Sequence, residues 1–375
     1  MELLQLQHFG QTLRLEGSLA GWQQLYWGEH LVSQLTATEN QQSQSTHAFE
    51  LTSKPEQATV PDNENIAQTD NIIKCQLVTE LTWQPFVIKY ELFIDGVSVA
   101  QGSRNSKDIE KQIPVKTVKE EKKFSIVGLA SLGFKLLKSA KIIKVVLAGA
   151  SLAAYSWFFS FQFALSLLAC LVFHEYGHIK AMQYFGMKTK GVYLIPFVGG
   201  LAVSDEKINT RWQDVVISIM GPTFGLLLSI ACVLLYWITD NIFFAGLATF
   251  NSLLNLFNLL PILPLDGGHI LKSISFSMNS KLGLLACIAG ATAGVFVSYS
   301  LGLVLLGFLL LIGSLEIVSE WRTRHQSHLL PLDRYGQIFS SVWYLMTVAG
   351  LVAIIFYFAK SGDQLLALPL QILGA

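Results

Sequence analysis

Apolar and polar residues alternate along the first part of the chain, in short runs separated by turn residues. Residues 13–17 and 87–93 show the period of two that is typical of half-buried β-strands, and Asp95-Gly96 is a strong hairpin turn. The same pattern predicts strands at 24–27, 31–33 and 73–81. We therefore expect residues 1–115 to form a small β-rich accessory domain, to which the pattern assigns no chemistry.

This region also contains a weak internal similarity. Residues 25–34 resemble residues 92–101, and both segments read as a strand, a turn and a second strand. Chance explains such a short similarity as well as duplication does. The histidines His8, His30 and His47 lack the spacing of metal ligands, so we expect them to be ordinary surface residues.

From about residue 142 the apolar residues form long uninterrupted runs. Such runs predict transmembrane helices, and spans are expected near 142–159, 161–183, 214–237, 242–263, 282–298, 301–318 and 338–358. The first two share an uncharged run of 29 residues, 145–173, which a single span would also fit. The expected fold class is a polytopic α-helical membrane protein, with about seven transmembrane helices and a small N-terminal β-rich soluble domain.

Composition and charge placement agree with a membrane protein. Of the 375 residues, 52% are hydrophobic and 14% are charged, which excludes an ordinary soluble protein. Lys and Arg gather in residues 104–144, which hold eleven of them. We expect residues 116–141 to be a basic linker. It either lies as an amphipathic helix on an anionic membrane surface or only sets the topology.

The basic residues also orient the spans. If residues 145–173 contain two spans, three further basic loops lie on the same side as the basic cluster. These loops are 180–211, 264–281 and 319–337, with five, two and three Lys/Arg. The positive-inside rule then places the N-terminus in the cytoplasm and the tail at 361–375 on the opposite side. Residues 1–10 lack a signal-peptide pattern, and we expect the inner membrane of a bacterium.

The strongest chemical signal is Phe173-His174-Glu175-Tyr176-Gly177-His178, which ends an uncharged apolar stretch. His174 and His178 are four residues apart, so on a helix they share one face and can hold one zinc ion. Glu175 lies beside that face, where a general base for a metal-bound water would sit. A charge inside a membrane costs about 2.5–3.5 kcal/mol on insertion scales, so this carboxylate indicates function; a polar helix end at the interface is the alternative.

A zinc catalyst needs a third protein ligand and one open position for water. Asp266 is the obvious candidate, because it is the only carboxylate between Asp240 and Glu316. The prolines and glycines of residues 258–269 would unwind the helix end and free the backbone to turn Asp266 inward. His269 is nearby, and we expect it to have a supporting role, since a fourth protein ligand would close the site.

These motifs resemble the site-2 protease family of intramembrane zinc metalloproteases. The matching pieces are His174-Glu175-Tyr176-Gly177-His178, the Gly199-Gly200 hairpin, Gly221-Pro222, and Asn258 through Pro264-Leu265-Asp266-Gly267. They come in the family's order within residues 160–275. The resemblance implies one Zn²⁺ held by His174, His178 and Asp266, with Glu175 as the base. It also implies that Asn258 positions the substrate or the developing oxyanion, with a polar contact between helices as the alternative.

The expected function is cleavage of transmembrane segments by residues 142–360, in regulated intramembrane proteolysis. The expected partners are a membrane-protein substrate with a transmembrane helix and the lipid bilayer, with no nucleic acid. Residues 191–203 are too short to span, and as a re-entrant hairpin they would offer an edge to an extended substrate; an interfacial loop is the alternative. A metal carrier, which would show repeated broken helices, and a non-catalytic membrane scaffold are the rival functions.

Overall fold

The computed structural model describes residues 1–18, 21–36, 44–53, 71–112, 141–158, 160–195, 199–204, 208–300, 304–323, 329–360 and 366. The chain divides into two compact units. The first is Met1–Gln112 with Thr323–Asp333, and the second is Ile113–Arg322 with Arg334–Ala375. The predicted basic linker at 116–141 and the predicted tail at 361–375 lie outside the described residues, apart from one residue each.

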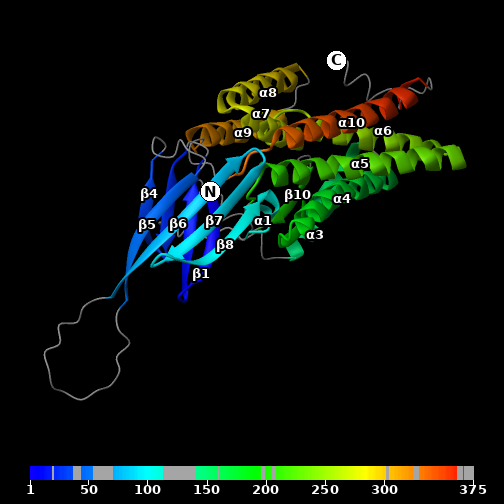
Figure 1. The fold of residues 1–375 in the computed structure, drawn as a ribbon. Helices are drawn as coiled ribbons and strands as arrows, with labels where there is room; N and C mark the ends of the chain where they lie inside the picture. Colours follow the sequence, from blue (N-terminus) through cyan, green and yellow to red (C-terminus); the bar gives the residue numbers. More distant parts are fainter. Residues whose placement is uncertain are drawn as a thin grey trace, which may run out of the picture. The chain divides into compact units, whose positions relative to one another are not determined.

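The first unit consists of two antiparallel sheets (Figure 1). Consecutive strands are neighbours in both sheets, in the orders β1-β2-β3-β4 and β5-β6-β7-β8. The elements are β1 (Glu2–His8), β2 (Gln11–Gly17), β3 (Gln23–Trp27), β4 (His30–Leu35), β5 (Gln44–Ser53), β6 (Asn71–Trp83), β7 (Phe86–Ile94), β8 (Val97–Asn105) and the short helix α1 (Ser106–Glu110). The predicted β-rich N-terminal region is therefore confirmed, and each predicted strand lies within an observed one.

Residues from both sheets form one hydrophobic core. Alternate residues on the inner faces are almost wholly buried, including Leu15 and Leu25 of the first sheet and Leu77 and Ile88 of the second. Leu330 of the segment Thr323–Asp333 joins the same core. Burying one such side chain contributes about 1.5–3 kcal/mol, so this shared core accounts for the association of the two sheets.

His47 lies inside this unit, so the predicted surface position for it is wrong. Its exposed fraction is 0%. It stands opposite the buried Leu77 in the antiparallel pairing of β5 with β6, and residues that stand opposite each other point to the same face. Its ring nitrogens Nδ1 and Nε2 lie 3.0 Å from Ser33 Oγ and 2.9 Å from Gln23 Oε1. The alternation of β5 thus turns His47 inward, where neutral side chains satisfy both nitrogens.

The two sheets share one local irregularity. The register of β3 and β4 shifts between Leu25 and Tyr26, and the register of β7 and β8 shifts between Leu92 and Phe93. Leu25 and Leu92 occupy the same place in the similar segments 25–34 and 92–101. The predicted strand–turn–strand form of both segments is confirmed, and the matching β-bulge favours duplication over chance.

The second unit is helical (Figure 1). Its elements are α3 (Lys141–Phe158), α4 (Phe161–Tyr184), β9 (Thr189–Ile195), β10 (Gly199–Ser204), α5 (Arg211–Thr239), α6 (Ile242–Asn258), α7 (Asp266–Met278), α8 (Ser280–Ser300), α9 (Val304–Thr323) and α10 (Arg334–Ala359). A helix occupies each predicted span, while the short α7 was not predicted. The span predicted to end at residue 263 ends at Asn258, because Pro261 and Pro264 lack the backbone N–H that would continue a helix.

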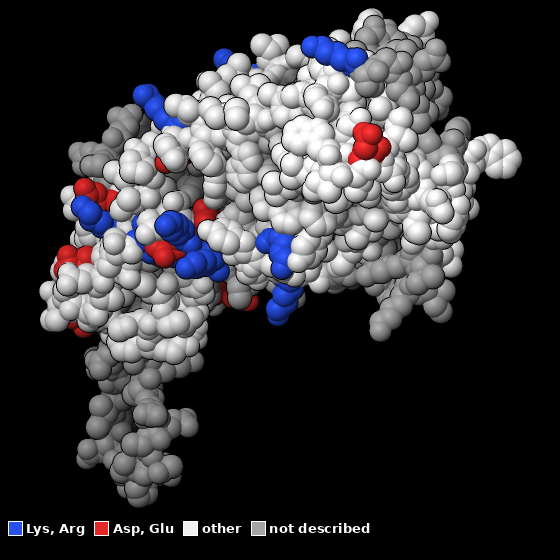
Figure 2. Space-filling view, turned by 90° about the vertical axis from the view of Figure 1, so that its right-hand side faces the viewer, with Lys and Arg blue, Asp and Glu red and all other residues white. Residues whose placement is uncertain are grey.

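Two of the described helices, α5 and α10, are long and apolar enough to cross a membrane. This finding does not confirm the predicted count of spans. Large apolar side chains nevertheless face outward on several helices, such as Ile238 of α5, Phe296 of α8 and Met346 of α10. Figure 2 shows a broad area of one face with few Lys, Arg, Asp or Glu side chains. Apolar surface of this extent is typical of contact with lipid or with another protein.

The segment predicted to be a re-entrant hairpin, or an interfacial loop, contains two paired β-strands. β9 and β10 pair antiparallel, with Tyr193 opposite Leu201 and Ile195 opposite Gly199. Residues 196–198, between the two strands, lie outside the described residues. The structure therefore presents a two-stranded sheet between α4 and α5.

Candidate metal centre

The α4 helix carries three of the predicted site residues. Its start is fixed by Ser160, whose Oγ accepts a hydrogen bond from Phe163 N. The helix then continues unbroken through His174, Glu175 and His178, whose exposed fractions are 2%, 4% and 7%. The helical repeat places both histidines on one buried face, as predicted.

Asp266 enters the site at the start of α7. The chain leaves α6 at Asn258, passes through Pro261 and Pro264, and resumes a helix at Asp266. Gly267 permits this turn, because a Cβ atom there would lie 2.1 Å from Leu259 O. The predicted break of the helix before Asp266 is confirmed.

The three predicted ligands meet in space. His174 Nε2 lies 3.1 Å from His178 Nε2 and 3.3 Å from Asp266 Oδ2, and His178 Nε2 lies 3.5 Å from the same oxygen. A tetrahedral zinc site with bonds of about 2.0–2.1 Å separates its ligand atoms by about 3.3–3.4 Å. Two imidazole nitrogens and a carboxylate oxygen at these distances fit a zinc ion.

Gly221 of α5 leaves room beside the ligand nitrogens. A Cβ atom at this position would lie 2.3 Å from His178 Nε2 and 2.9 Å from His174 Nε2. Gly177 of α4 faces the same helix, and its Cβ would lie 2.4 Å from Met220 O. Small residues thus bring α4 and α5 into close contact and keep side chains away from the place where a metal would bind.

The outer ring nitrogens of both histidines are occupied. His178 Nδ1 donates to the backbone carbonyl of Ile217 at 2.6 Å, and His174 Nδ1 lies 2.7 Å from Asn255 Oδ1. Zinc-binding histidines usually make such a contact with the nitrogen that does not bind the metal. Asn255 was not among the residues predicted from the sequence.

The remaining predicted residues differ in position. Glu175 Oε1 is 3.9 Å from His174 Nε2, so this carboxylate lies next to the ligand group. Asn258 is the half-buried last residue of α6. In the described part of the chain, no hydrogen bond joins its side chain to His174, His178 or Asp266. The structure therefore brings Glu175 to the site and leaves the role of Asn258 a proposal.

A charged cluster joins α5, α7 and α9, and its His269 lies three residues after Asp266 on α7. Lys272 Nζ lies 2.5 Å from Glu316 Oε1 and 3.9 Å from Asp214 Oδ2. His269 Nδ1 is 3.6 Å from Asp214 Oδ1, and Ser273 Oγ donates to Asp214 Oδ2 at 2.5 Å. His269 therefore takes part in this cluster and not in the ligand group. The acidic and basic partners of the cluster were not predicted from the sequence.

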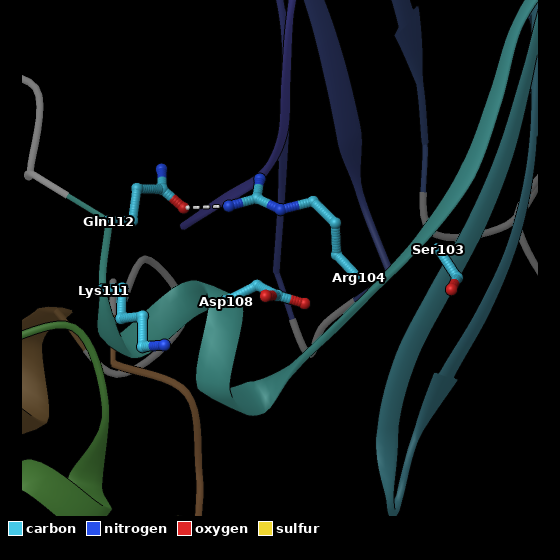
Figure 3. A pocket seen from close by; sticks show the side chains of 5 residues that line it. All are labelled: Ser103, Arg104, Asp108, Lys111 and Gln112. Atoms are coloured by element: carbon cyan, nitrogen blue, oxygen red, sulfur yellow. Dashed lines mark hydrogen bonds between the residues drawn. The ribbon is translucent and has the colours of Figure 1, made fainter.

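The β-rich unit has an open hollow of about 410 Å³, lined by Ser103, Arg104, Asp108, Lys111 and Gln112 (Figure 3). Arg104 is already bonded there, because its Nη1 donates to Leu3 O and its Nη2 to Gln112 Oε1. Asp108 Oδ2 accepts from Asn105 N at the start of α1. These contacts serve the local fold, and the hollow shows no grouping of metal ligands.

Comparison with known families gives a match to peptidase family M50 over residues 162–245 and 239–284. Stage IV sporulation protein FB of Bacillus subtilis is 31% identical over 186 residues, 46% of this chain and 63% of that protein. A zinc metalloprotease of Methanocaldococcus jannaschii is 34% identical over 146 residues, 38% of this chain and 41% of that protein. A protein of Synechocystis named as a putative zinc metalloprotease is 30% identical over 199 residues, which are 52% of this chain and 47% of that protein.

The family match includes every predicted ligand. Residues 162–284 contain His174, His178 and Asp266, together with Glu175. The match to each of these relatives spans between 41% and 63% of the relative's own length. The resemblance predicted from the motifs is confirmed for this part of the chain.

Proposed function

We propose that the chain is an intramembrane zinc metalloendopeptidase, because residues 162–284 match the model of peptidase family M50. Its substrates would be the transmembrane segments of membrane proteins. The observation that carries the proposal is the group of His174, His178 and Asp266, whose ligand atoms lie within 4.8 Å of one another beside the buried Glu175.

Each residue of the group has a role in this proposal. His174, His178 and Asp266 would hold one zinc per chain, which when bound polarises the scissile carbonyl and makes water more acidic. Glu175 would accept the proton of the attacking water and pass it to the leaving amine. The 3.9 Å between Glu175 Oε1 and His174 Nε2 supports this role, since it keeps the base close to the ligand face. Asn258 would position the substrate or the developing oxyanion.

The surroundings of the group support a substrate from the membrane. The helices that carry the ligands belong to an apolar unit, and α5 is long enough to cross a bilayer. A helical substrate hides its amides in its own hydrogen bonds, so it must unwind before attack. We propose that the β9–β10 hairpin receives the unwound segment by strand addition.

The test separates the base from the ligands. Glu175→Gln should keep about one zinc per chain and lose nearly all cleavage, because an amide of similar size cannot take the proton of water. Asp266→Ala, His174→Ala and His178→Ala should lose zinc and cleavage together. Metal analysis of the purified chain beside a cleavage assay on a transmembrane reporter gives both readouts.

The matched control is Asp240→Asn, which changes an exposed carboxylate at the end of α5 and should change neither readout. A scaffold would cleave nothing in any form, whereas a metal carrier would tolerate Glu175→Gln. Full cleavage by Glu175→Gln would disprove the mechanism. Unchanged zinc content in Asp266→Ala would remove Asp266 from the ligand set.

A further inference from the structure

We propose that Asn251 and Asn255 of α6 are positioning residues that fix the tautomer and ring orientation of His174. Neither residue is part of the predicted ligand set, and both have an exposed fraction of 0%. The inference rests on the proposed zinc site and concerns residues that would contact a zinc ligand and not the zinc itself. Its basis is a continuous chain of hydrogen bonds from α5 to His174, in which each bond fixes the orientation of the next side chain.

The chain begins at a backbone carbonyl of α5, a group that can only accept. Asn251 Nδ2 lies 2.9 Å from Gly225 O and 2.8 Å from Ser229 Oγ. An amide nitrogen has two N–H groups, and this one therefore donates both to α5. Asn251 Oδ1 consequently points away from α5 and is left as an acceptor.

Asn255 takes its orientation from Asn251. Its Nδ2 donates to Asn251 O at 2.8 Å and to Asn251 Oδ1 at 3.1 Å, so both N–H groups are again used. The Oδ1 atom of Asn255, which can only accept, is thereby turned toward the metal site. A reversed Asn255 amide would place its oxygen against two other oxygens, which the arrangement forbids.

His174 is the end of the chain. Its Nδ1 lies 2.7 Å from Asn255 Oδ1, and because that oxygen can only accept, Nδ1 must carry the proton. In a neutral imidazole the other nitrogen, Nε2, then has a free lone pair, which is the form that binds a metal. His178 reaches the same tautomer through a direct bond from its Nδ1 to Ile217 O.

The α5 helix makes space for this arrangement. A Cβ atom at Gly225 would lie 2.0 Å from Asn255 Oδ1, so any side chain there would displace the amide. Burying a polar amide costs about 1–3 kcal/mol unless its hydrogen bonds are met, and here they are met on both asparagines. Gly225, Asn251 and Asn255 thus act together to aim one imidazole.

The test measures zinc affinity of the purified full chain by competition with a chromogenic chelator. Asn255→Leu, which keeps the volume and removes the acceptor, should bind zinc about 10–100-fold more weakly. Asn251→Leu touches no ligand. It removes Oδ1, one of the two acceptors of the Asn255 N–H₂ group, and keeps the backbone carbonyl of residue 251, so it should weaken zinc binding less than Asn255→Leu does.

The matched control is Thr249→Val. Thr249 is as buried as Asn255 on the same helix, but its hydroxyl donates only to Ala245 O of its own turn. This variant should keep the affinity of the original chain. With Co²⁺ as the metal, the visible absorption spectrum should change in Asn255→Leu and Asn251→Leu and remain the same in Thr249→Val.

The outcomes distinguish this inference from the proposed function. Absence of zinc binding by the original chain would overturn the metal site itself. Suppose that the original chain binds zinc and cleaves. If Asn255→Leu and Asn251→Leu then both bind zinc as tightly as the original chain, the proposed positioning of His174 by the two asparagines is wrong. If Asn255→Leu does not fold, Asn251→Leu decides the question. Unchanged zinc affinity and an unchanged Co²⁺ spectrum in that variant would show that Asn251 does not orient His174 through Asn255.

Discussion

His47 is a histidine held without charge in the core of the β-rich unit. Burial lowers the pKa of His47 from 6.5 to about 4, and its hydrogen-bond partners Ser33 and Gln23 are neutral. Between these two pH values the unfolded chain binds a proton that the folded chain excludes. The free energy of unfolding should therefore fall as the pH drops through this window, by at most about 3 kcal/mol.

Thermal unfolding of the detergent-solubilised chain, followed from neutral pH to the lower end of this window, measures the effect. His47→Gln removes the titrating group, so its stability should depend less on pH than that of the original chain. His30→Gln, a change at an exposed histidine of β4, is the control and should retain the full dependence. Equal slopes for the original chain and His47→Gln would contradict the prediction.

The residues of the ligand group could be predicted because their signal is local. Two histidines four apart on a helix share a face whatever surrounds them, and prolines and glycines mark the break before Asp266. Asn255 gives no such signal, since its role depends on a histidine 81 positions away. Its spacing of four from Asn251 on an apolar helix was the one available indication. His47 was mispredicted because β5 itself was not predicted.

At the scale of elements, the cluster of Asp214, His269, Lys272 and Glu316 ties three helices together. Lys272 is the central cation, with a side chain exposed by 8%, and it contacts carboxylates from α5 and α9. Lys272→Met would leave Asp214 without this neighbouring charge in a largely buried place. Removing one partner of a buried ion pair costs about 3–5 kcal/mol, so the melting temperature should fall clearly.

The control for Lys272→Met is Lys281→Met, a change at an exposed lysine of α8 that should leave melting unchanged. A second variant, Lys272→Met combined with Asp214→Asn, removes both charges and should recover part of the loss. Melting of Lys272→Met at the temperature of the original chain would show that the cluster contributes nothing to the association of α5, α7 and α9.

Elements were predictable to the extent that their pattern is periodic or continuous. The long apolar runs gave the helices, and alternation gave most strands. The α7 helix was missed because residues 266–278 include a lysine and several serines, so their hydropathy is too low for a span. The pairing of β5 with β6 and the matched bulges depend on contacts between strands, which no single segment encodes.

At the scale of the whole molecule, the chemistry and the β-rich unit are separate in sequence. All three proposed ligands and Glu175 lie within residues 162–284, outside the first unit. The segment Thr323–Asp333 follows α9 in the chain, yet it belongs with the strands through Leu330. We therefore propose an accessory role for the β-rich unit, while its removal would deprive Leu330 of its hydrophobic core.

The orientation in the membrane is the last prediction. Residues 1–140 and the loops that follow α4, precede α8 and follow α9 carry most of the Lys and Arg, so they should lie in the cytoplasm. The same rule places the tail beyond Lys360 and the turn at Asp240 on the opposite side. Reporter fusions within residues 1–120, at Asp240 and at Gly362 test the arrangement. The reporters at Asp240 and Gly362 should lie on the same side of the membrane, and the reporter within residues 1–120 should lie on the other side. If the first reporter and the one at Gly362 share a side, the number of spans is even and the predicted count of seven is wrong.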